Sequence, residues 1–305
     1  MRIAVLGPGG VGGLLAGALQ RSGEDVTVLA RESTAATIAE QGVRVSSVTL
    51  GDFTAHPRVL SELQEPVDSL IVATKAAGLQ AALERVGATP GLVLPLLNGL
   101  DHVALLRGRF APQSVLAGTI RVEADRPAPG VVVHTSRFLL VEMASRYEQA
   151  AAPMRALAAA LSRAGIDARG DWPIAQRSEA QVIWSKLVRL NALACTTSAY
   201  DKLLGEIRET PALRADLLGA IDEASAVARA EGADDVEPQK ALDELERAHP
   251  TLGSSMQRDI AAGRPPEIDA IPGAVLRAGA RHSLQCPTIE RLVALILARV
   301  EGLGT

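Results

Sequence analysis

The start of the chain constrains its fold more than any other segment. Residues 2–6 form a short apolar run, and a glycine-rich turn follows directly. The turn consists of Gly7, Pro8, Gly9, Gly10, Val11 and Gly12. An apolar strand, a Gly-x-Gly-x-x-Gly turn and a helix-forming run through Leu19 predict the opening of a dinucleotide-binding βαβ unit. The alternative is an ordinary glycine-rich turn.

Each glycine of this motif has a separate task in such a unit. Gly7 allows the tight turn, Gly9 lets the backbone approach a pyrophosphate, and Gly12 lets the helix pack closely on the sheet. The phosphates would bind at the helix N-terminus, where free N–H groups and the helix dipole favour anions. We therefore expect a cofactor site at this turn.

Composition narrows the class of protein. The 305 residues suggest two domains of about 150 residues each. The net charge of −4 gives no reason to expect nucleic acid or an acidic membrane surface as a partner. No uncharged run approaches the ~20 residues of a membrane span, and the N-terminus does not read as a signal peptide. The two cysteines are isolated and the five histidines lack ligand spacing, so we expect a cytoplasmic protein without a metal.

The first half of the chain alternates strand and helix patterns. Strands are expected at residues 25–30, 69–74, 92–97 and 114–120, although Pro95 weakens the third of them. Residues 131–134 and 138–142 read as the two arms of a hairpin within residues 130–143. Alternating β and α elements predict a mostly parallel sheet with right-handed crossovers.

The second half of the chain is dominated by helical patterns. They fall at residues 181–194, 211–231, 241–249 and 287–300. Gly170-Asp171-Trp172-Pro173 interrupts the chain before them. The sequence thus predicts an α/β fold, with a Rossmann-type parallel-sheet domain at residues 1–170 and an all-α domain at residues 171–305. The helical half has room for a homodimer interface, which the sequence does not locate.

The residue that follows the second strand distinguishes the two nicotinamide cofactors. Sites that prefer NAD place Asp or Glu there to bind the ribose 2′-hydroxyl. This chain has Arg31, about 20 residues beyond the glycine turn, where a guanidinium can donate two hydrogen bonds to a 2′-phosphate. We therefore expect NADP (NADPH). The alternative is that Arg31 is a solvated cation paired with Glu32.

Three further stretches suggest chemistry, and each has a structural alternative. Asn98 follows a predicted strand, where open α/β sheets bind ligands, but Asn98-Gly99 is also a common turn. Lys186 lies on an apolar helix, where lost solvation can make a poised acid, but such a lysine can also extend its amine to the surface. In the third stretch, Ser254 and Glu267 can equally serve only to cap and stabilise helices.

Together these motifs resemble the ketopantoate reductase (2-dehydropantoate 2-reductase) family over nearly the whole chain. The resemblance includes the glycine turn, Lys75 in Val-Ala-Thr-Lys-Ala, Asn98-Gly99, and Trp184-x-Lys186-Leu187. The most specific match is the late block, Ser254-Ser255-Met256-Gln257-x-Asp259 with Glu267-Ile268-Asp269-x-Ile271-x-Gly273.

The resemblance implies hydride transfer from NADPH to the C2 ketone of a 2-keto acid, with the two domains closing over the small-molecule substrate. Lys186 would donate a proton to the carbonyl oxygen, which gains alkoxide character. Glu267 would bind the substrate or orient the lysine, and Ser255 would hydrogen-bond the substrate carboxylate. Asn98 would position the lysine and the substrate. The resemblance also places Lys75, Asn98 and Glu267 against the cofactor.

The chain departs from the family where polar contacts to the substrate are expected. The family usually has asparagine at the positions of Leu190, Ala194, Leu204, Leu252 and Pro272. Asn191 is one residue out of step, which on a helix is a rotation of about 100°. Because an apolar pocket cannot select for a substrate hydroxyl, we hypothesise that the chemistry is kept and the substrate differs. It would be a bulkier or more apolar 2-keto acid, or another activated ketone.

Two other classes of function remain as alternatives. The missing asparagines fit a catalytically inactive NADP-binding sensor or interaction protein, whereas the retained Lys186, Ser255 and Glu267 argue against it. Another two-domain dehydrogenase, for a 3-hydroxy acid or a polyol phosphate, is compatible with the fold, because fold alone does not give function. Ketopantoate is the default substrate, and a role in pantothenate biosynthesis is left open by the sequence.

Overall fold

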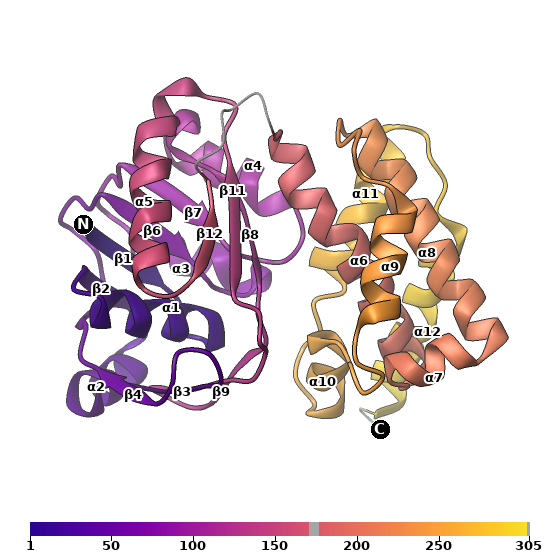
Figure 1. Cartoon of the computed structure of the whole chain (residues 1–305), viewed down its shortest axis with the longest axis horizontal. Helices are drawn as coiled ribbons and strands as arrows, with labels where there is room; N and C mark the ends of the chain where they lie inside the picture. The colour runs from indigo at the N-terminus through magenta and orange to yellow at the C-terminus, as the bar shows by residue number, and fades with distance from the viewer. Residues whose placement is uncertain (171–176, 304–305) are drawn as a thin grey trace. The chain divides into compact units, whose positions relative to one another are not determined.

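The computed structural model describes residues 1–170 and 177–303 (Figure 1). The chain divides into two compact units. The first consists of residues 1–97 and 102–182, and the second consists of residues 98–101 and 183 onward. The short segment Asn98–Asp101 therefore belongs with the second unit, although it lies in the first half of the sequence. Of the boundary predicted at residues 170–173, residues 171–173 lie outside the described residues, so this boundary stays a prediction.

The first unit is built on a five-stranded parallel sheet with the strand order β5-β2-β1-β6-β7. Its strands are β1 (Arg2–Leu6), β2 (Asp25–Leu29), β5 (Arg58–Leu60), β6 (Ser69–Val72) and β7 (Leu92–Pro95). All of them except β5 lie where the sequence predicts a strand. Pro95 is tolerated because β7 is an edge strand, where one missing ladder donor costs little.

Two smaller sheets complete the β structure of the first unit. One has the order β4-β3-β10-β9 and the other β12-β11-β8. Their strands are β3 (Val43–Ser47), β4 (Phe53–Ala55), β8 (Ala117–Arg121), β9 (Ala124–Ala128), β10 (Val131–His134), β11 (Leu140–Ala144) and β12 (Asp167–Arg169). The α-helices are α1 (Gly10–Arg21), α2 (Glu32–Gln41), α3 (Leu79–Leu83), α4 (Asp101–Arg109, whose first residue groups with the second unit) and α5 (Ala151–Arg163).

The hairpin predicted within residues 130–143 is wrong. Both of its arms are strands, but β10 pairs with β3 and β9, whereas β11 pairs with β8 and β12. The link between the arms carries the chain from one sheet to the other. Ser136 in this link accepts a hydrogen bond from the Glu123 N–H and donates one to the Phe138 carbonyl. The two strands were predicted from the sequence, but their partners come from elsewhere in the chain.

Helix α1 packs closely on the sheet that contains β3, β9 and β10 through a row of glycines. A Cβ added to Gly10 would lie 2.2 Å from the Ala124 carbonyl oxygen. A Cβ added to Gly13 would lie 2.7 Å from a methyl of Val132, and Gly17 is similarly close to Val45. Other residues of the helix are buried in the core that includes the strands of the parallel sheet. Small residues thus let one helix contact two sheets.

The described residues of the second unit fold into helices without strands, as predicted. The helices are α6 (Glu179–Tyr200, which begins in the first unit), α7 (Leu204–Glu209), α8 (Pro211–Ala230), α9 (Pro238–Arg247), α10 (Ser255–Ala261), α11 (Ala274–Arg281) and α12 (Pro287–Leu303). A π-helical turn, η5 (Asp269–Gly273), precedes α11. The four helices expected from the sequence correspond to α6, α8, α9 and α12.

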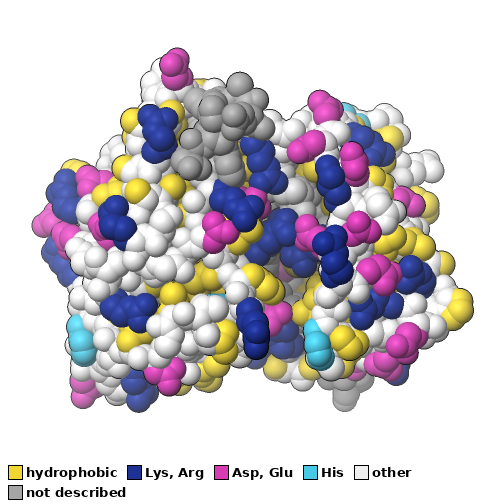
Figure 2. All heavy atoms as spheres, viewed as in Figure 1, with side chains coloured by type: hydrophobic (Ala, Val, Ile, Leu, Met, Phe, Trp, Pro, Cys, Tyr) yellow, Lys and Arg dark blue, Asp and Glu magenta, His cyan; other side chains and the backbone are white. Residues whose placement is uncertain are grey.

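The surface carries charged side chains of both signs, and the two cysteines lie in the interior. On the face shown in Figure 2, acidic and basic side chains are interspersed. Ion pairs join many of the charged side chains of the described residues, as between Arg214 and Glu246. Cys195 and Cys286 are free and buried. Within residues 1–170 and 177–303, no helix is both long enough and apolar enough to cross a membrane.

Candidate active site

The glycine turn of the first unit has a backbone that larger residues would not adopt. Gly7 has φ of +92°, a conformation that L side chains rarely occupy. A Cβ on Gly12 would lie 2.1 Å from the Gly7 carbonyl oxygen, so no side chain fits there. Gly9 differs, because an added Cβ would meet no atom within 4 Å. The turn is therefore closed toward the protein and open at Gly9.

The N-terminus of α1 is suited to an anionic group. The helix begins at Gly10, its N-cap is Gly9, and no side chain caps it. A helix start of this kind leaves backbone N–H groups directed at a ligand. The hydroxyl of Thr74, two residues beyond the end of β6, is buried without a hydrogen-bond partner, and the methyl of Thr74 would lie 2.8 Å from a Cβ on Gly7. These donors fit the pyrophosphate and ribose of a dinucleotide.

Arg31 and Lys75 lie at the same edge of the parallel sheet as the glycine turn. Arg31 follows β2, Lys75 follows β6, and both strands are neighbours of β1. Arg31 is the exposed N-cap residue of α2, and among the ion pairs of the described residues it makes none with Glu32. Lys75 is exposed and begins a short 3-10 turn, in which its carbonyl accepts a hydrogen bond from the Gly78 N–H.

In the second unit, three polar residues form a hydrogen-bonded chain. Lys186 Nζ donates to Asn98 Oδ1 at 2.9 Å, and Asn98 Nδ2 donates to Glu267 Oε2 at 2.9 Å. Asn98 is 88 residues from Lys186 and 169 residues from Glu267. The structure thus brings together three of the residues that the sequence singles out.

Lys186 is not a surface lysine. Only 8% of its surface is exposed, so the alternative in which its amine extends into solvent is wrong. Burial removes water from the amine and leaves it dependent on protein acceptors such as the Asn98 oxygen. A buried amine with a directed hydrogen bond is the kind of group that proton transfer requires.

The loop that carries Asn98 is pressed against the turn that follows Glu267. Gly99 has φ of +84°, and an added Cβ would lie 2.0 Å from the Ala270 carbonyl oxygen. Ala270 lies in the π-helical turn η5, and Pro272 is the reason that this turn is π-helical. Because proline has no N–H, the Ile268 carbonyl is bonded instead by the Gly273 N–H, five residues on, at 2.9 Å. This turn was not predicted from the sequence, where its signal is Pro272 inside a helical pattern.

The two adjacent serines have different environments. Ser254 is 3% exposed and caps α10, accepting a hydrogen bond from the Gln257 N–H at 3.0 Å. Its hydroxyl also accepts a hydrogen bond from Thr197 Oγ1 at 2.8 Å. The capping alternative is therefore confirmed for Ser254. Ser255, at the first position of α10, is exposed and available to a ligand.

Thr197 was not predicted and lies on the same helix as the lysine. Lys186 and Thr197 are 11 residues apart, about three turns of α6, and so share a face. Leu190 on this face is partly exposed, whereas Ala194 is fully buried. Asn191 points elsewhere. It is fully buried, and its Oδ1 accepts a hydrogen bond from Cys195 Sγ at 3.5 Å, so it does not replace an asparagine on the lysine face.

The first residue of α6 is held by two arginines of the first unit. Glu179 accepts a hydrogen bond from Arg107 Nη2 at 2.6 Å and one from the Arg146 N–H at 2.9 Å. Burial raises the pKa of Glu179, but the hydrogen bonds from both arginines outweigh it and hold this pKa below its usual value. The start of the helix that carries the lysine is thus anchored by charge.

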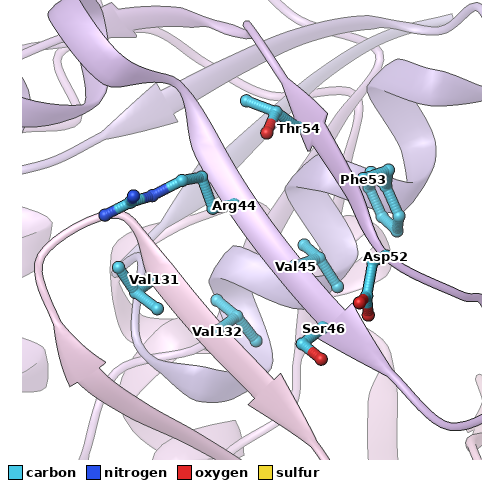
Figure 3. Close-up of a pocket in the computed structure, with 8 residues that line it drawn as sticks. All are labelled: Arg44, Val45, Ser46, Asp52, Phe53, Thr54, Val131 and Val132. Carbon is cyan, nitrogen blue, oxygen red and sulfur yellow. The ribbon is translucent and has the colours of Figure 1, made fainter.

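A separate depression lies on the small sheet that contains β3, β4 and β10. It has a volume of about 530 Å³ and is lined by Arg44, Val45, Ser46, Asp52, Phe53, Thr54, Val131 and Val132 (Figure 3). None of the residues predicted for the site lines it. Among residues 1–170 and 177–303, no group of three or more His, Cys, Asp or Glu residues is placed to hold a metal.

A Rossmann-type unit joined to a helical unit with a buried lysine defines a class, the two-domain dinucleotide-dependent oxidoreductases. Residues 3–142 match the family model described as ketopantoate reductase PanE/ApbA, and residues 180–300 match the model for the C terminal part of the same family. The chain belongs to the ketopantoate reductase family. It is therefore an oxidoreductase that acts on CH–OH groups.

Relatives and solved structures match nearly the full length. The 2-dehydropantoate 2-reductase of Caulobacter vibrioides is 31% identical over 97% of this chain and 98% of its own. A crystal structure of 2-dehydropantoate 2-reductase from Geobacter metallireducens is 27% identical, covers 98% of this chain and 99% of its own, and has a TM-score of 0.86. A ternary structure of D-mandelate dehydrogenase with NADH and anilino(oxo)acetate is 23% identical, covers 100% of both chains, and shares the fold with a TM-score of 0.86.

Proposed function

We propose that this protein uses NADPH to reduce a 2-keto acid to the 2-hydroxy acid, with Lys186 as the general acid. The observation that carries the proposal is the hydrogen-bonded chain from Lys186 through Asn98 to Glu267. Reduction of a ketone leaves negative charge on its oxygen, and that oxygen must receive a proton. A buried, oriented ammonium supplies both the proton and a compensating charge.

The order of donors and acceptors in this chain has a chemical reason. An ionised carboxylate only accepts, so Glu267 must face the NH₂ of the Asn98 amide. The amide is thereby held with its oxygen toward Lys186, whose ammonium only donates. One N–H of the lysine is directed to Asn98, which sets the direction of the remaining ones. Glu267 therefore orients the lysine through Asn98.

The residues of the first unit support a nicotinamide dinucleotide. When bound, this cofactor supplies the hydride. The open turn at Gly9 and the uncapped N-terminus of α1 would hold its pyrophosphate, and Lys75 would lie near its ribose. Arg31 is exposed at the end of β2 and would bind a 2′-phosphate, which favours NADP over NAD. NADH, which is bound in the D-mandelate dehydrogenase structure, is the competing cofactor.

The substrate proposed is a 2-keto acid with an apolar side chain. The exposed hydroxyl of Ser255 is available to the substrate carboxylate. Leu190 and Leu252 are partly exposed apolar residues at positions where the family usually has asparagine. They would contact the rest of the substrate without offering a hydrogen bond to a hydroxyl group. The D-mandelate dehydrogenase, which shares the fold, indicates that this architecture accommodates hydroxy acids other than pantoate.

NADPH oxidation with a panel of 2-keto acids, ketopantoate included, tests the proposal. We expect Lys186→Ala to lower kcat by about 10²–10⁴-fold, the usual contribution of a general acid. The matched control is Lys240→Ala, which removes an exposed lysine of α9 paired with Glu237. Equal rates for Lys186→Ala and the wild type would remove the lysine as the acid.

The same panel separates the substrate hypotheses. Turnover of ketopantoate with kcat/KM of about 10⁴ M⁻¹s⁻¹ or more would contradict the preference for an apolar substrate. Absence of turnover with every 2-keto acid, by a protein that binds NADPH, would instead favour the inactive sensor.

A further inference from the structure

We propose that Arg277 is a positioning residue for the acid, because it holds the segment Asn98–Asp101 in the place where Asn98 meets Lys186 and Glu267. This inference rests on the proposed function of the lysine. Neither the glycine turn nor the late sequence block pointed to Arg277. It lies on α11, one turn beyond the end of η5.

One guanidinium contacts both segments that carry the hydrogen-bonded chain. Arg277 Nε and Nη2 donate to Asp101 Oδ2 at 3.2 Å and 2.6 Å. Nη1 donates to Asp269 Oδ1 at 2.6 Å, and Nη2 also donates to the Asp269 carbonyl at 2.9 Å. Asp101 is three residues beyond Asn98, and Asp269 is two residues beyond Glu267. The arginine therefore joins the chain segments on either side of the Asn98–Glu267 hydrogen bond.

The backbone around Arg277 is shaped to admit the guanidinium and the loop. A Cβ on Gly273 would lie 3.2 Å from Arg277 Nη1 and 3.4 Å from Asp269 Oδ1, so glycine leaves room for this ion pair. At Gly99 an added Cβ would lie 2.0 Å from the Ala270 carbonyl oxygen, so the loop packs closely there as well. Packing holds the segment Asn98–Asp101 at Gly99, and the ion pair with Arg277 holds it at Asp101. Asn98, the first residue of the segment, is thereby kept in place.

Arginine suits this task better than lysine. Its planar guanidinium presents several donors in fixed directions and can serve two carboxylates at once, whereas an ammonium is a point charge on a flexible stem. The side chains of Arg277 and Asp101 are 44% and 47% exposed, so this pair contributes little to global stability. Its effect should therefore appear in catalysis rather than in the melting temperature.

Helix α11 offers a matched control. Arg281 lies one turn beyond Arg277, is 49% exposed, and makes an ion pair with Glu231 rather than with the loop. Removing Arg281 breaks one ion pair of this helix, and removing Arg277 breaks two. Only removal of Arg277 frees the segment of Asn98.

The experiment measures kcat, KM, NADPH affinity and melting temperature for Arg277→Ala, Arg277→Lys and Arg281→Ala, with the best 2-keto acid of the panel. We expect Arg277→Ala to lower kcat about 10–100-fold, since misplacement of a catalytic group by about 1 Å can cost 10²-fold. The melting temperature should match that of Arg281→Ala, and NADPH affinity should change less than kcat. Arg277→Lys should restore part of kcat, because it returns the charge without the planar fork.

A double-mutant cycle with Asp101→Asn completes the test. If the arginine acts through the loop, Asp101→Asn and Arg277→Ala should each lower kcat, and their combination should lower it little further. Unchanged kcat in Arg277→Ala, or an equal loss in Arg281→Ala, would overturn the inference. Failure of the proposed function is distinguishable, because Lys186→Ala would then also leave the rate unchanged.

Discussion

The two units of this protein build their candidate sites from different materials. In the first unit the site is backbone, a turn shaped by Gly7, Gly9 and Gly12 before an uncapped helix. In the second unit it is side chains, with Lys186, Asn98 and Glu267 contributed by three distant segments. A backbone site needs particular residues only where a side chain would intrude. A side-chain site needs particular residues at every contact and also needs its loops held.

Gly12→Ala should have the largest effect and is confined to the backbone site. The new Cβ would lie 2.1 Å from the Gly7 carbonyl oxygen, so the helix must move away from the turn. We expect a loss of about 3 kcal/mol or more of unfolding free energy, above the usual cost of overpacking, and loss of NADPH binding. Denaturant titration and fluorescence binding measure the two effects.

Gly9→Ala is the control for this variant. Its Cβ meets no protein atom within 4 Å, so stability should stay at the wild-type value while cofactor binding weakens. Equal stability of the two variants would show that the turn is not constrained as described.

Gly99→Ala applies the same chemical change to the side-chain site. A Cβ there meets the Ala270 carbonyl at 2.0 Å and forces alanine to φ of +84°. We expect about 2–3 kcal/mol of destabilisation from crowding and the left-handed backbone. We also expect kcat to fall more than NADPH affinity, the opposite pattern to Gly12→Ala. A larger loss of NADPH affinity than of kcat in Gly99→Ala would contradict this separation of the two sites.

Glu179 provides a pH-dependent test of a side-chain contact at the start of α6. Its folded-state pKa is lowered, so it contributes stability above its unfolded-state pKa near 4.5, and this contribution is lost as the pH falls through the folded-state value. Glu179→Gln should remove up to about 3 kcal/mol at pH 7, the lower end for breaking a buried pair. Urea unfolding at pH 7 and pH 3 measures this, and the difference between variant and wild type should shrink at the lower pH.

Arg31→Ala tests whether one side chain contributes to cofactor binding at the backbone site. Losing charge-assisted hydrogen bonds to a 2′-phosphate, worth about 1.5–3 kcal/mol, should weaken NADPH binding roughly 10–100-fold. NADH binding should be unchanged, because NADH has no such phosphate. Arg58→Ala, at an exposed arginine paired with Glu65, is the control. Equal weakening of both cofactors would show that Arg31 does not select NADP.

The smallest expected effect distinguishes two neighbouring hydroxyls. Ser254→Ala removes the N-cap of α10 and its contact with Thr197, and should cost about 1 kcal/mol of stability. Ser255→Ala removes an exposed hydroxyl, and should raise KM for the keto acid with no change in stability. Thermal unfolding and steady-state kinetics on both variants check the contrast, which a stability loss in Ser255→Ala would refute.

The same contrast explains what could be predicted from sequence. The glycine turn, α1 and most parallel strands follow from patterns a few residues long, because their hydrogen bonds are local or repeat along the sheet. The pairing of β10 and β11 was predicted wrongly, because each strand depends on partners such as β3 and β8. The polar β9, with Arg126 and Pro127, did not read as a strand at all.

The side-chain site was less accessible to such patterns. No spacing relates Asn98 to Lys186 and Glu267, which lie 88 and 169 positions away from it, so resemblance to a family was needed to group them. Arg277 was missed because its contacts with Asp101 and Asp269 exist only after folding. Thr197 was missed for the same reason, since its partner Ser254 is 57 residues away.

The glycine row of α1 has a consequence for how this protein would report on its ligand. Gly10 touches the backbone of β9, and Gly13 touches Val132 of β10, while the helix N-terminus faces the open turn. Because this helix packs so closely on two sheets, restricting its motion also restricts the motion of both sheets. Occupancy of the turn should therefore slow amide hydrogen exchange in β9 and β10, strands that the ligand itself need not touch.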